Sequence, residues 1–149
     1  MHIILLSYIQ QMIYITRREH FNAAHKLFNP NWSDDQNNQV FGKCANPNWH
    51  GHNYNLYVTV KGNVSPDTGY SVNLKELSTI IRTYIVDKLD HKNLNLDVDF
   101  MKGLMPSTEN VAIAIWKELQ PHVNALDCQL HSIKLFETEN NSVEYFGEE

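Results

Sequence analysis

The sequence predicts an α+β domain with helices on one face of an antiparallel sheet. Three observations carry this prediction: two alternating segments near the N-terminus, two segments with helical spacing in the middle, and a second alternating region near the C-terminus. Strands, then helices, then strands is the order typical of helices segregated to one face of a sheet. The chain has 149 residues, of which 42% are hydrophobic, and this suits one domain, residues 1–149, with its own core.

Four segments show the alternation of a half-buried strand. Residues 13–25 and 50–60 come early, and residues 129–136 and 143–146 form a predicted β-hairpin joined through Asn140-Asn141. The inward-facing parity holds Ile13, Ile15, Phe21, Ala23 and His25 in the first strand, and His50, His52, Tyr54, Leu56, Val58 and Val60 in the second. Both early strands therefore carry histidines on the face that is otherwise apolar.

Two amphipathic helices are predicted between these strands. Asn73-Leu74-Lys75-Glu76 resembles a capping box, and apolar residues then recur at helical spacing over residues 73–89. Pro106-Ser107-Thr108-Glu109 opens the second helix, predicted over residues 108–120 with Pro121 near its end. Core packing explains the apolar stripes of both helices better than cofactor binding does.

The residues before the first strand show no targeting signal. The run Ile3-Ile4-Leu5-Leu6 is too short to span a membrane, and it has neither a basic start nor a small-residue cleavage site. We interpret residues 1–11 as an N-terminal extension of a domain over residues 12–149. The cysteines, Cys44 and Cys128, lack the spacing of a disulfide framework. This fits a reducing compartment, and we expect a cytoplasmic protein.

His50 and His52 are candidate metal ligands. On a strand, residues i and i+2 face the same way with Cα atoms about 6.5 to 7 Å apart, and Gly51 between them allows close approach. If the first strand pairs with this one, His25 supplies a third imidazole. Catalytic zinc is usually held by three protein ligands, such as three neutral imidazoles, and keeps its fourth coordination position open. The alternative is that all three are ordinary polar residues at strand ends, but the His-x-His pattern beside a cysteine favours a metal.

Cys44 has three interpretations. As a fourth zinc ligand, it would close the site and make the protein a non-catalytic zinc module. Beside an open zinc site it would instead be a base or nucleophile, because a nearby cation lowers the pKa of a thiol. A metal-free cysteine-histidine hydrolase is the third, but it leaves His25 and the His50-x-His52 pair unexplained. Cys128, before an apolar strand, is interpreted as a small core residue.

Two further polar groups are candidates for function. Asp90 and His91 follow the first predicted helix, where both can point into one cleft and the carboxylate can orient the imidazole. The alternative is that Asp90 and His91 are ordinary polar residues at a helix C-terminus. Glu137 continues the apolar parity of residues 129–136, and a carboxylate is costly to bury unpaired. A planar ligand edge bearing an amine and a ring N–H would suit Glu137, as would an intramolecular Lys or Arg.

Five motifs in this order resemble one family. They are FxAAH, FGKCxNPNxHGHNY, LDHKNLN, STENVA and ETENN, and the resemblance runs from about Ile13 to the end of the chain. Together they are similar to the 6-pyruvoyltetrahydropterin synthase and 6-carboxytetrahydropterin synthase family. Ala45 and Trp49 depart from the commoner Asn and Gly of the cysteine loop, which bears on the shape of that loop and not on the metal.

The resemblance implies roles for individual residues. His25, His50 and His52 match the family's zinc ligands, and Cys44 its catalytic thiol. Asp90 and His91 match the rest of its catalytic triad. Glu137 matches the carboxylate that anchors the pterin ring, and Thr108 and Glu109 fall in the stretch that resembles the wall of the pterin pocket.

The resemblance also implies an assembly. Family members have the tunnelling fold (T-fold), here a four-stranded antiparallel sheet with two helices on one face. Three subunits close a twelve-stranded barrel, and two trimers stack. We therefore expect a homohexamer with active sites between subunits, which would bring Asp90 and His91 to a neighbour's Cys44.

The implied activity is that of a zinc-dependent lyase converting 7,8-dihydroneopterin triphosphate to 6-pyruvoyltetrahydropterin with release of triphosphate, as in tetrahydrobiopterin biosynthesis. The alternative is 6-carboxytetrahydropterin synthase of the queuosine pathway, which uses the same substrate and releases acetaldehyde and triphosphate. The interval Cys44-x5-His50 is longer than in many of those enzymes, and this favours the pyruvoyl product.

The charge fits a small-molecule enzyme. A net charge of -5 argues against a general nucleic-acid binder, and no membrane partner is expected. The net charge does not exclude local basic residues that could bind the triphosphate of the substrate, and the candidates are Arg17, Lys26 and Lys43. Asp34, Asp35 and the neighbouring asparagines are predicted to form a solvated loop.

Overall fold

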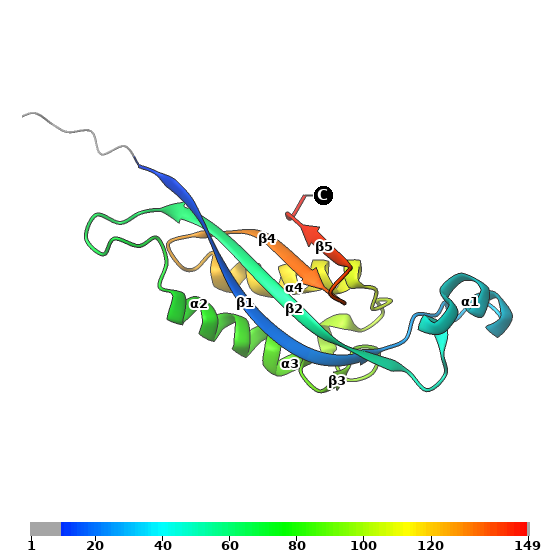
Figure 1. The fold of residues 1–149 in the computed structure, drawn as a ribbon. Coiled ribbons are helices and arrows are strands. Elements are labelled where there is room, and N and C mark those ends of the chain that lie inside the picture. The colour runs from blue at the N-terminus through cyan, green and yellow to red at the C-terminus, as the bar shows by residue number, and fades with distance from the viewer. Residues whose placement is uncertain (1–9, 149) are drawn as a thin grey trace, which may run out of the picture.

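A computed structural model describes residues 10–148, and its centre is a five-stranded sheet in the order β3-β1-β2-β4-β5 (Figure 1). The strands are β1 (Met12–His25), β2 (His50–Asn63), β3 (Lys92–Asn93), β4 (Gln129–Phe136) and β5 (Ser142–Tyr145). The pairs β1–β2, β2–β4 and β4–β5 are antiparallel, which confirms the four predicted strands.

The predicted strand count of four is wrong. β3 adds a fifth strand, which pairs in parallel with β1 at Ala23 and Ala24. Two residues are too few for any alternation to be visible in the sequence. Most of the N-terminal extension predicted for residues 1–11 lies outside the described residues.

Both predicted helices are present. α2 (Leu74–Ile81), the π-helical turn η2 (Arg82–Val86) and α3 (Asp87–Leu89) follow one another without a break and occupy the helix predicted over residues 73–89. The side chain of Asn73 caps the start of α2 by accepting hydrogen bonds from the backbone N–H groups of Lys75 and Glu76.

α4 (Thr108–Val123) runs three residues beyond the predicted end, and Pro121 lies inside its last turn. A proline removes one helical hydrogen bond, here the one to the carbonyl of Lys117. Val123 is fully buried in the core, and this packing favours the last turn despite the lost bond. No helix in the described part of the chain is long and apolar enough to cross a bilayer.

The helices α2 and α4 lie against one face of the sheet (Figure 1). Apolar side chains from the two layers form one core, among them Phe21, Tyr54, Leu56, Val58, Ile133 and Leu135 from the strands and Leu77, Ile81, Ile85, Val111, Ile115 and Leu119 from the helices. The opposite face of the sheet is polar. There Thr16 and Thr59 share a hydrogen bond of 2.7 Å, and Arg18 donates to Asn55 at 2.6 Å. These observations confirm the α+β class.

The segment between β1 and β2 contains the helix α1 (Asp34–Phe41) and the 3₁₀ turn η1 (Gly42–Ala45). Figure 1 shows α1 beyond the end of the β1–β2 pair, apart from the other helices. Asp34 and Asp35 are exposed to solvent as predicted, but the prediction of a loop is wrong because the segment is a helix. Ser33 accepts a hydrogen bond from the N–H of Gln36, and Asp34 and Asp35 occupy the first turn, where carboxylates interact favourably with the helix dipole.

Candidate active site

The register of β1 and β2 brings three histidines together on the face that packs against the helices. His25 is the direct partner of His50, and Ala23 is the partner of His52. The ring centroids of His25 and His50 are 4.5 Å apart, and each lies 5.0 Å from that of His52. The predicted meeting of three imidazoles is confirmed.

The protonation of this cluster suits metal binding. The Nδ1–H of His25 donates to the carbonyl oxygen of Pro106 at 2.8 Å, which leaves the lone pair on Nε2. Burial lowers the pKa of His25, His50 and His52, although the charge of Glu137 acts in the opposite direction. All three imidazoles are therefore neutral at pH 7, the form that coordinates a metal.

One ring nitrogen of each histidine is buried and has no hydrogen-bond partner among the described residues: Nε2 of His25, Nδ1 of His50 and Nε2 of His52. Buried polar atoms without partners are rare and call for an explanation such as an ion. Ligand atoms of the three histidines and Glu137 all lie within 4.8 Å of one another. Because imidazole nitrogens and a carboxylate oxygen suit transition-metal ions, this group of four residues fits a metal.

Glu137 reaches this cluster from the residue directly after β4. Its Oε1 lies 2.8 Å from Nε2 of His52 and 3.8 Å from Nε2 of His25. The hydroxyl of Thr108, at the first position of α4, donates to Oε2. The prediction that Glu137 has partners is confirmed, and those partners are histidines and a threonine. Within residues 10–148 no Lys or Arg forms an ion pair with Glu137.

Sequence reasoning missed Tyr54 as a site residue. Its side chain is fully buried, and its hydroxyl oxygen lies 3.4 Å from Nδ1 of His25. Burial raises the pKa of Tyr54, and the negative charge of Glu137 acts in the same direction. The signal was its parity with His50 and His52, which places all three on the inward face of β2.

Cys44 is not one of the four grouped residues. It sits half-buried on η1, and its backbone carbonyl accepts a hydrogen bond of 2.8 Å from the N–H of Leu27, just after β1. The structure brings Glu137 to the three imidazoles in place of the thiol. A closed site of three histidines and Cys44 is therefore not the arrangement seen.

Asp90 and His91 lie at the other edge of β1, next to β3. Asp90 Oδ2 is 2.9 Å from Nδ1 of His91, and Asp90 Oδ1 accepts from the N–H of Asn22 at 2.8 Å. That backbone hydrogen bond, followed by the one with His91, holds the pKa of Asp90 below its usual value. His91 is 78% exposed and has a positive φ of 59°.

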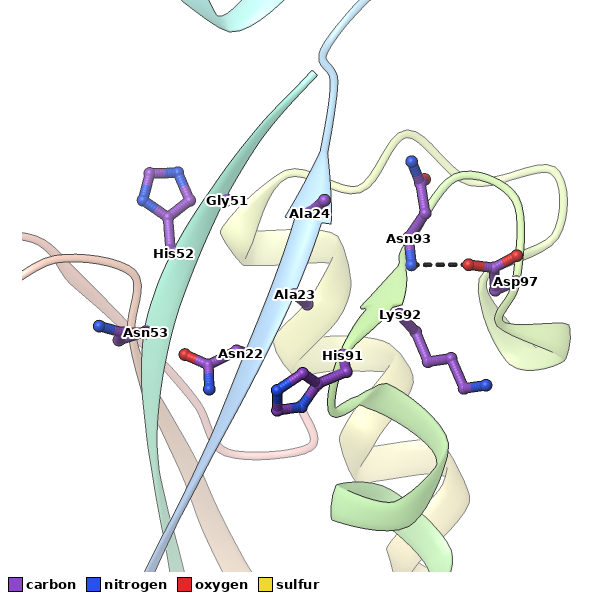
Figure 2. Close-up of a pocket in the computed structure, with 10 residues that line it drawn as sticks. All are labelled: Asn22, Ala23, Ala24, Gly51, His52, Asn53, His91, Lys92, Asn93 and Asp97. Carbon is purple, nitrogen blue, oxygen red and sulfur yellow. Dashed lines mark hydrogen bonds between the residues drawn. The ribbon is translucent and has the colours of Figure 1, made fainter. Parts of the chain in front are cut away.

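Figure 2 shows His91 with Asn22 and Asn53 at a pocket of about 580 Å³. β1 and β2 separate this edge of the sheet from β4 and Glu137. Within one chain, Asp90 and His91 are not part of the four-residue group, although His91 and His52 line the same pocket (Figure 2).

The two remaining candidates on α4 differ in their contacts. Thr108 is buried against Glu137, whereas Glu109 is exposed in the first turn and lies outside the group of four residues. In the cysteine loop, Trp49 has a φ of 66°, a conformation that favours glycine. This explains why glycine is the commoner residue at that position.

Comparisons with known proteins agree with this geometry. The sequence profile described as 6-pyruvoyl tetrahydropterin synthase matches residues 14–148. The chain is 45% identical to the 6-pyruvoyl tetrahydrobiopterin synthase of Pongo abelii over 134 residues, which cover 90% of this chain and 91% of that protein. It is 30% identical to the 6-carboxy-5,6,7,8-tetrahydropterin synthase of Bacillus subtilis over 120 residues, which cover 78% and 72%.

A solved structure of the 6-pyruvoyl tetrahydropterin synthase of Caenorhabditis elegans superposes with a TM-score of 0.84 at 34% identity. The match covers 93% of this chain and 98% of that one. The fold, the profile and the sequence identities agree over nearly the whole described chain. The chain therefore belongs to the 6-pyruvoyl tetrahydropterin synthase family.

Proposed function

We propose that this protein converts 7,8-dihydroneopterin triphosphate to 6-pyruvoyltetrahydropterin and triphosphate. The observation that carries the proposal is the cluster of three neutral imidazoles with unpartnered nitrogens beside Glu137. The 45% identity to a relative named for this activity supports it. The reaction needs no external oxidant, since triphosphate leaves by elimination and the remaining redox change is internal to the pterin.

We propose that His25, His50 and His52 hold a zinc ion. Three imidazoles are the ligand set of catalytic zinc sites that keep one position open. When bound, the ion would supply Lewis-acid polarisation of the substrate's side-chain oxygens. The buried carbonyl of Pro106 fixes the tautomer of His25, so the protein itself orients at least one ligand.

Glu137 is proposed to orient the pterin by accepting hydrogen bonds from its 2-amino group and N3–H. A carboxylate matches two parallel N–H donors, and it stands beside the imidazoles that face the reacting side chain. Thr108 positions Glu137 through its hydroxyl. Glu109 is proposed as part of the pocket wall, at the exposed start of α4.

Cys44 is proposed as the base that removes a carbon-bound proton. His91, oriented by Asp90, would relay protons to and from the side chain. Because Asp90 and His91 lie across β1 and β2 from Glu137, they would serve the site of a neighbouring subunit.

That arrangement requires the hexamer of two stacked trimers, each a twelve-stranded barrel. Two sheet edges support such an assembly. The outer edge of β1 pairs with β3 only at Ala23 and Ala24, and β5 forms the opposite edge. Open edges favour pairing with another chain. A cytoplasmic location is also proposed, and the two free cysteines, Cys44 and Cys128, support it.

A second candidate product remains. 6-Carboxytetrahydropterin synthase activity would use the same substrate, and the similarity to the Bacillus subtilis enzyme of that name supports it. The identity to the pyruvoyl enzyme is higher, at 45% against 30%, and the interval between Cys44 and His50 also favours the pyruvoyl product.

The deciding experiment is incubation of the zinc-loaded protein with 7,8-dihydroneopterin triphosphate, with products identified by mass spectrometry. Triphosphate with 6-pyruvoyltetrahydropterin is the expected result. Acetaldehyde with 6-carboxytetrahydropterin would assign the alternative. Absence of turnover would contradict both, and unchanged turnover by Cys44→Ala would remove the thiol from the mechanism.

A further inference from the structure

The side chain of Asn95 pairs with both backbone groups of Lys26. Its Oδ1 accepts a hydrogen bond from the Lys26 N–H at 3.0 Å, and its Nδ2–H donates to the Lys26 carbonyl at 2.9 Å. The side-chain amide thus offers one acceptor and one donor, as the backbone of an adjacent strand would. Asn95 therefore extends the pairing along the edge of β1 beyond β3 and beyond His25, the last residue of β1.

The turn that follows β3 holds Asn95 itself in place. The N–H of Asn95 donates to Oδ1 of Asn93 at 2.9 Å, and the N–H of Asn93 donates to Oδ2 of Asp97 at 2.9 Å (Figure 2). The preceding residue, Leu94, is 1% exposed, and its N–H donates to the carbonyl of Ala24 at 2.8 Å. A side chain on a backbone fixed in this way can hold its partner in one position.

Lys26 and Leu27 connect this pairing to the cysteine loop, residues 44–49. The N–H of Leu27 donates to the carbonyl of Cys44 at 2.8 Å, and the ammonium group of Lys26 lies 5.9 Å from the centre of the Trp49 ring. These contacts fall at the first and last residues of the loop. A displacement of Lys26 would therefore release the segment that carries the thiol.

We propose that Asn95 is a positioning residue for Cys44, and that it acts through the backbone of Lys26 and Leu27. This inference rests on the proposed function, in which Cys44 removes a carbon-bound proton. A general base must stay within hydrogen-bond reach of the proton that it removes, and a displacement of about 1 Å can lower a rate about a hundredfold. The segment that carries Asp90 and His91 thus also sets the position of the thiol.

The first test compares steady-state kinetics of full-length, zinc-loaded variants. Asn95→Ala removes both hydrogen bonds with Lys26. It should lower kcat for 7,8-dihydroneopterin triphosphate by about tenfold or more, while KM stays within about twofold and the zinc content is unchanged. Asn63→Ala is the matched control, because Asn63 is also half-buried and lies at the opposite end of β2 from His50. It should match the wild type.

Alkylation of Cys44 by iodoacetamide tests the contact without any measurement of turnover. Peptide mass spectrometry distinguishes Cys44 from Cys128, the other free cysteine. Release of the cysteine loop exposes the half-buried thiol, so Cys44 in Asn95→Ala should react about threefold faster or more than in the wild type. In Asn63→Ala it should react at the wild-type rate.

Further variants separate positioning of the thiol from a general loss of structure. Asn95→Asp keeps an acceptor for the Lys26 N–H and should retain most of the wild-type kcat. Asn95→Leu keeps the approximate volume of the side chain without its polar atoms, and it takes the place of Asn95→Ala if circular dichroism shows that variant to be poorly folded. In a Cys44→Ala background, loss of the Asn95 amide should lower kcat no further, because its effect acts through the missing thiol.

An unchanged rate of Cys44 alkylation in Asn95→Ala or Asn95→Leu would overturn the link between Asn95 and the thiol. A rise in KM with kcat unchanged would also overturn the proposal, as would an equal further loss of kcat in the Cys44→Ala background. Absence of turnover by the wild type would overturn the proposed function, while the alkylation rates would still decide whether Asn95 holds the cysteine loop.

Discussion

Asn22 holds Asp90 in place through its backbone. The N–H of Asn22 donates to Asp90 Oδ1 at 2.8 Å, and the carbonyl of Asn22 accepts from the N–H of His91 at 2.7 Å. A strand residue therefore clamps the two residues that follow α3. The carboxylate presents its other oxygen to the His91 ring.

The hydrogen bonds that Asn22 makes with Asp90 and His91 predict that stability depends on pH. Because the folded-state pKa of Asp90 is below its ordinary value of 3.8, its stabilising effect is present above that value and is lost as the pH falls through the lowered folded-state pKa. Asp90→Asn should lower the free energy of unfolding at pH 6, and the difference from the wild type should shrink below pH 3.8. Urea unfolding at several pH values measures this.

Asp67→Asn is the control for that series, since the Asp67 side chain makes no hydrogen bond or ion pair among the described residues. It should track the wild type at every pH. A deficit in Asp90→Asn that stays constant down to low pH would contradict the electrostatic explanation.

Metal binding should stabilise the fold. A ligand at 100 times its dissociation constant adds about 2.7 kcal/mol to the free energy of unfolding. We expect zinc to raise the melting temperature of the wild type and a chelator to reverse this. His25→Ala should abolish the shift. His20→Ala should retain it, because His20 is exposed and of opposite parity on the same strand. An equal zinc shift in His25→Ala would refute the site.

Cys44 should matter for turnover and not for metal content. Since the thiol lies outside the group of ligand atoms, Cys44→Ala should bind zinc as the wild type does. Loss of a general base lowers kcat by about 10²- to 10⁴-fold. Cys128→Ala, at a buried cysteine away from the cluster, should retain turnover. Zinc analysis and steady-state kinetics test both variants, and loss of zinc from Cys44→Ala would point to a ligand role instead.

The positive φ of Trp49 predicts an unusual order of stability. A residue with a Cβ atom pays about 1 to 2 kcal/mol in the left-handed region, and glycine does not. Trp49→Gly should therefore be more stable than Trp49→Ala by about 1 kcal/mol, although both lose the contact of the indole ring with Lys26. Denaturant unfolding of the two variants gives the difference directly. Alanine equal to or above glycine would contradict a strained loop.

The sequence allowed prediction of what depends on local periodicity. Alternation located the long strands, and the shared parity of His25, His50 and His52 was enough to place them together once the strands were paired. The helix α1 was missed because it has no apolar stripe, although Ser33 and Gln36 have the spacing of a capping box. The only sequence signal for this helix was its N-terminal cap.

The contacts that could not be predicted are those between distant segments. Nothing local to Glu137 indicates that its carboxylate meets His52, since that contact depends on the register of β4 against β2 and on the start of α4. The carbonyl of Pro106 is a similar case. Its partner, His25, is 81 residues away in the sequence.

The π-helical turn η2 is a place where the chain before Asp90 can lose a residue without changing which way the following residues point. A π turn contains one residue more than an α turn. Removal of a single residue between Arg82 and Val86 would leave a regular α-helix with its hydrogen bonds intact. Because the wider π turn already spans the extra residue, everything that follows would keep its face, with Leu89 on the core and Asp90 beside Asn22. A one-residue deletion inside η2 should thus be a milder change than the same deletion in α2, which would rotate everything that follows by about 100°.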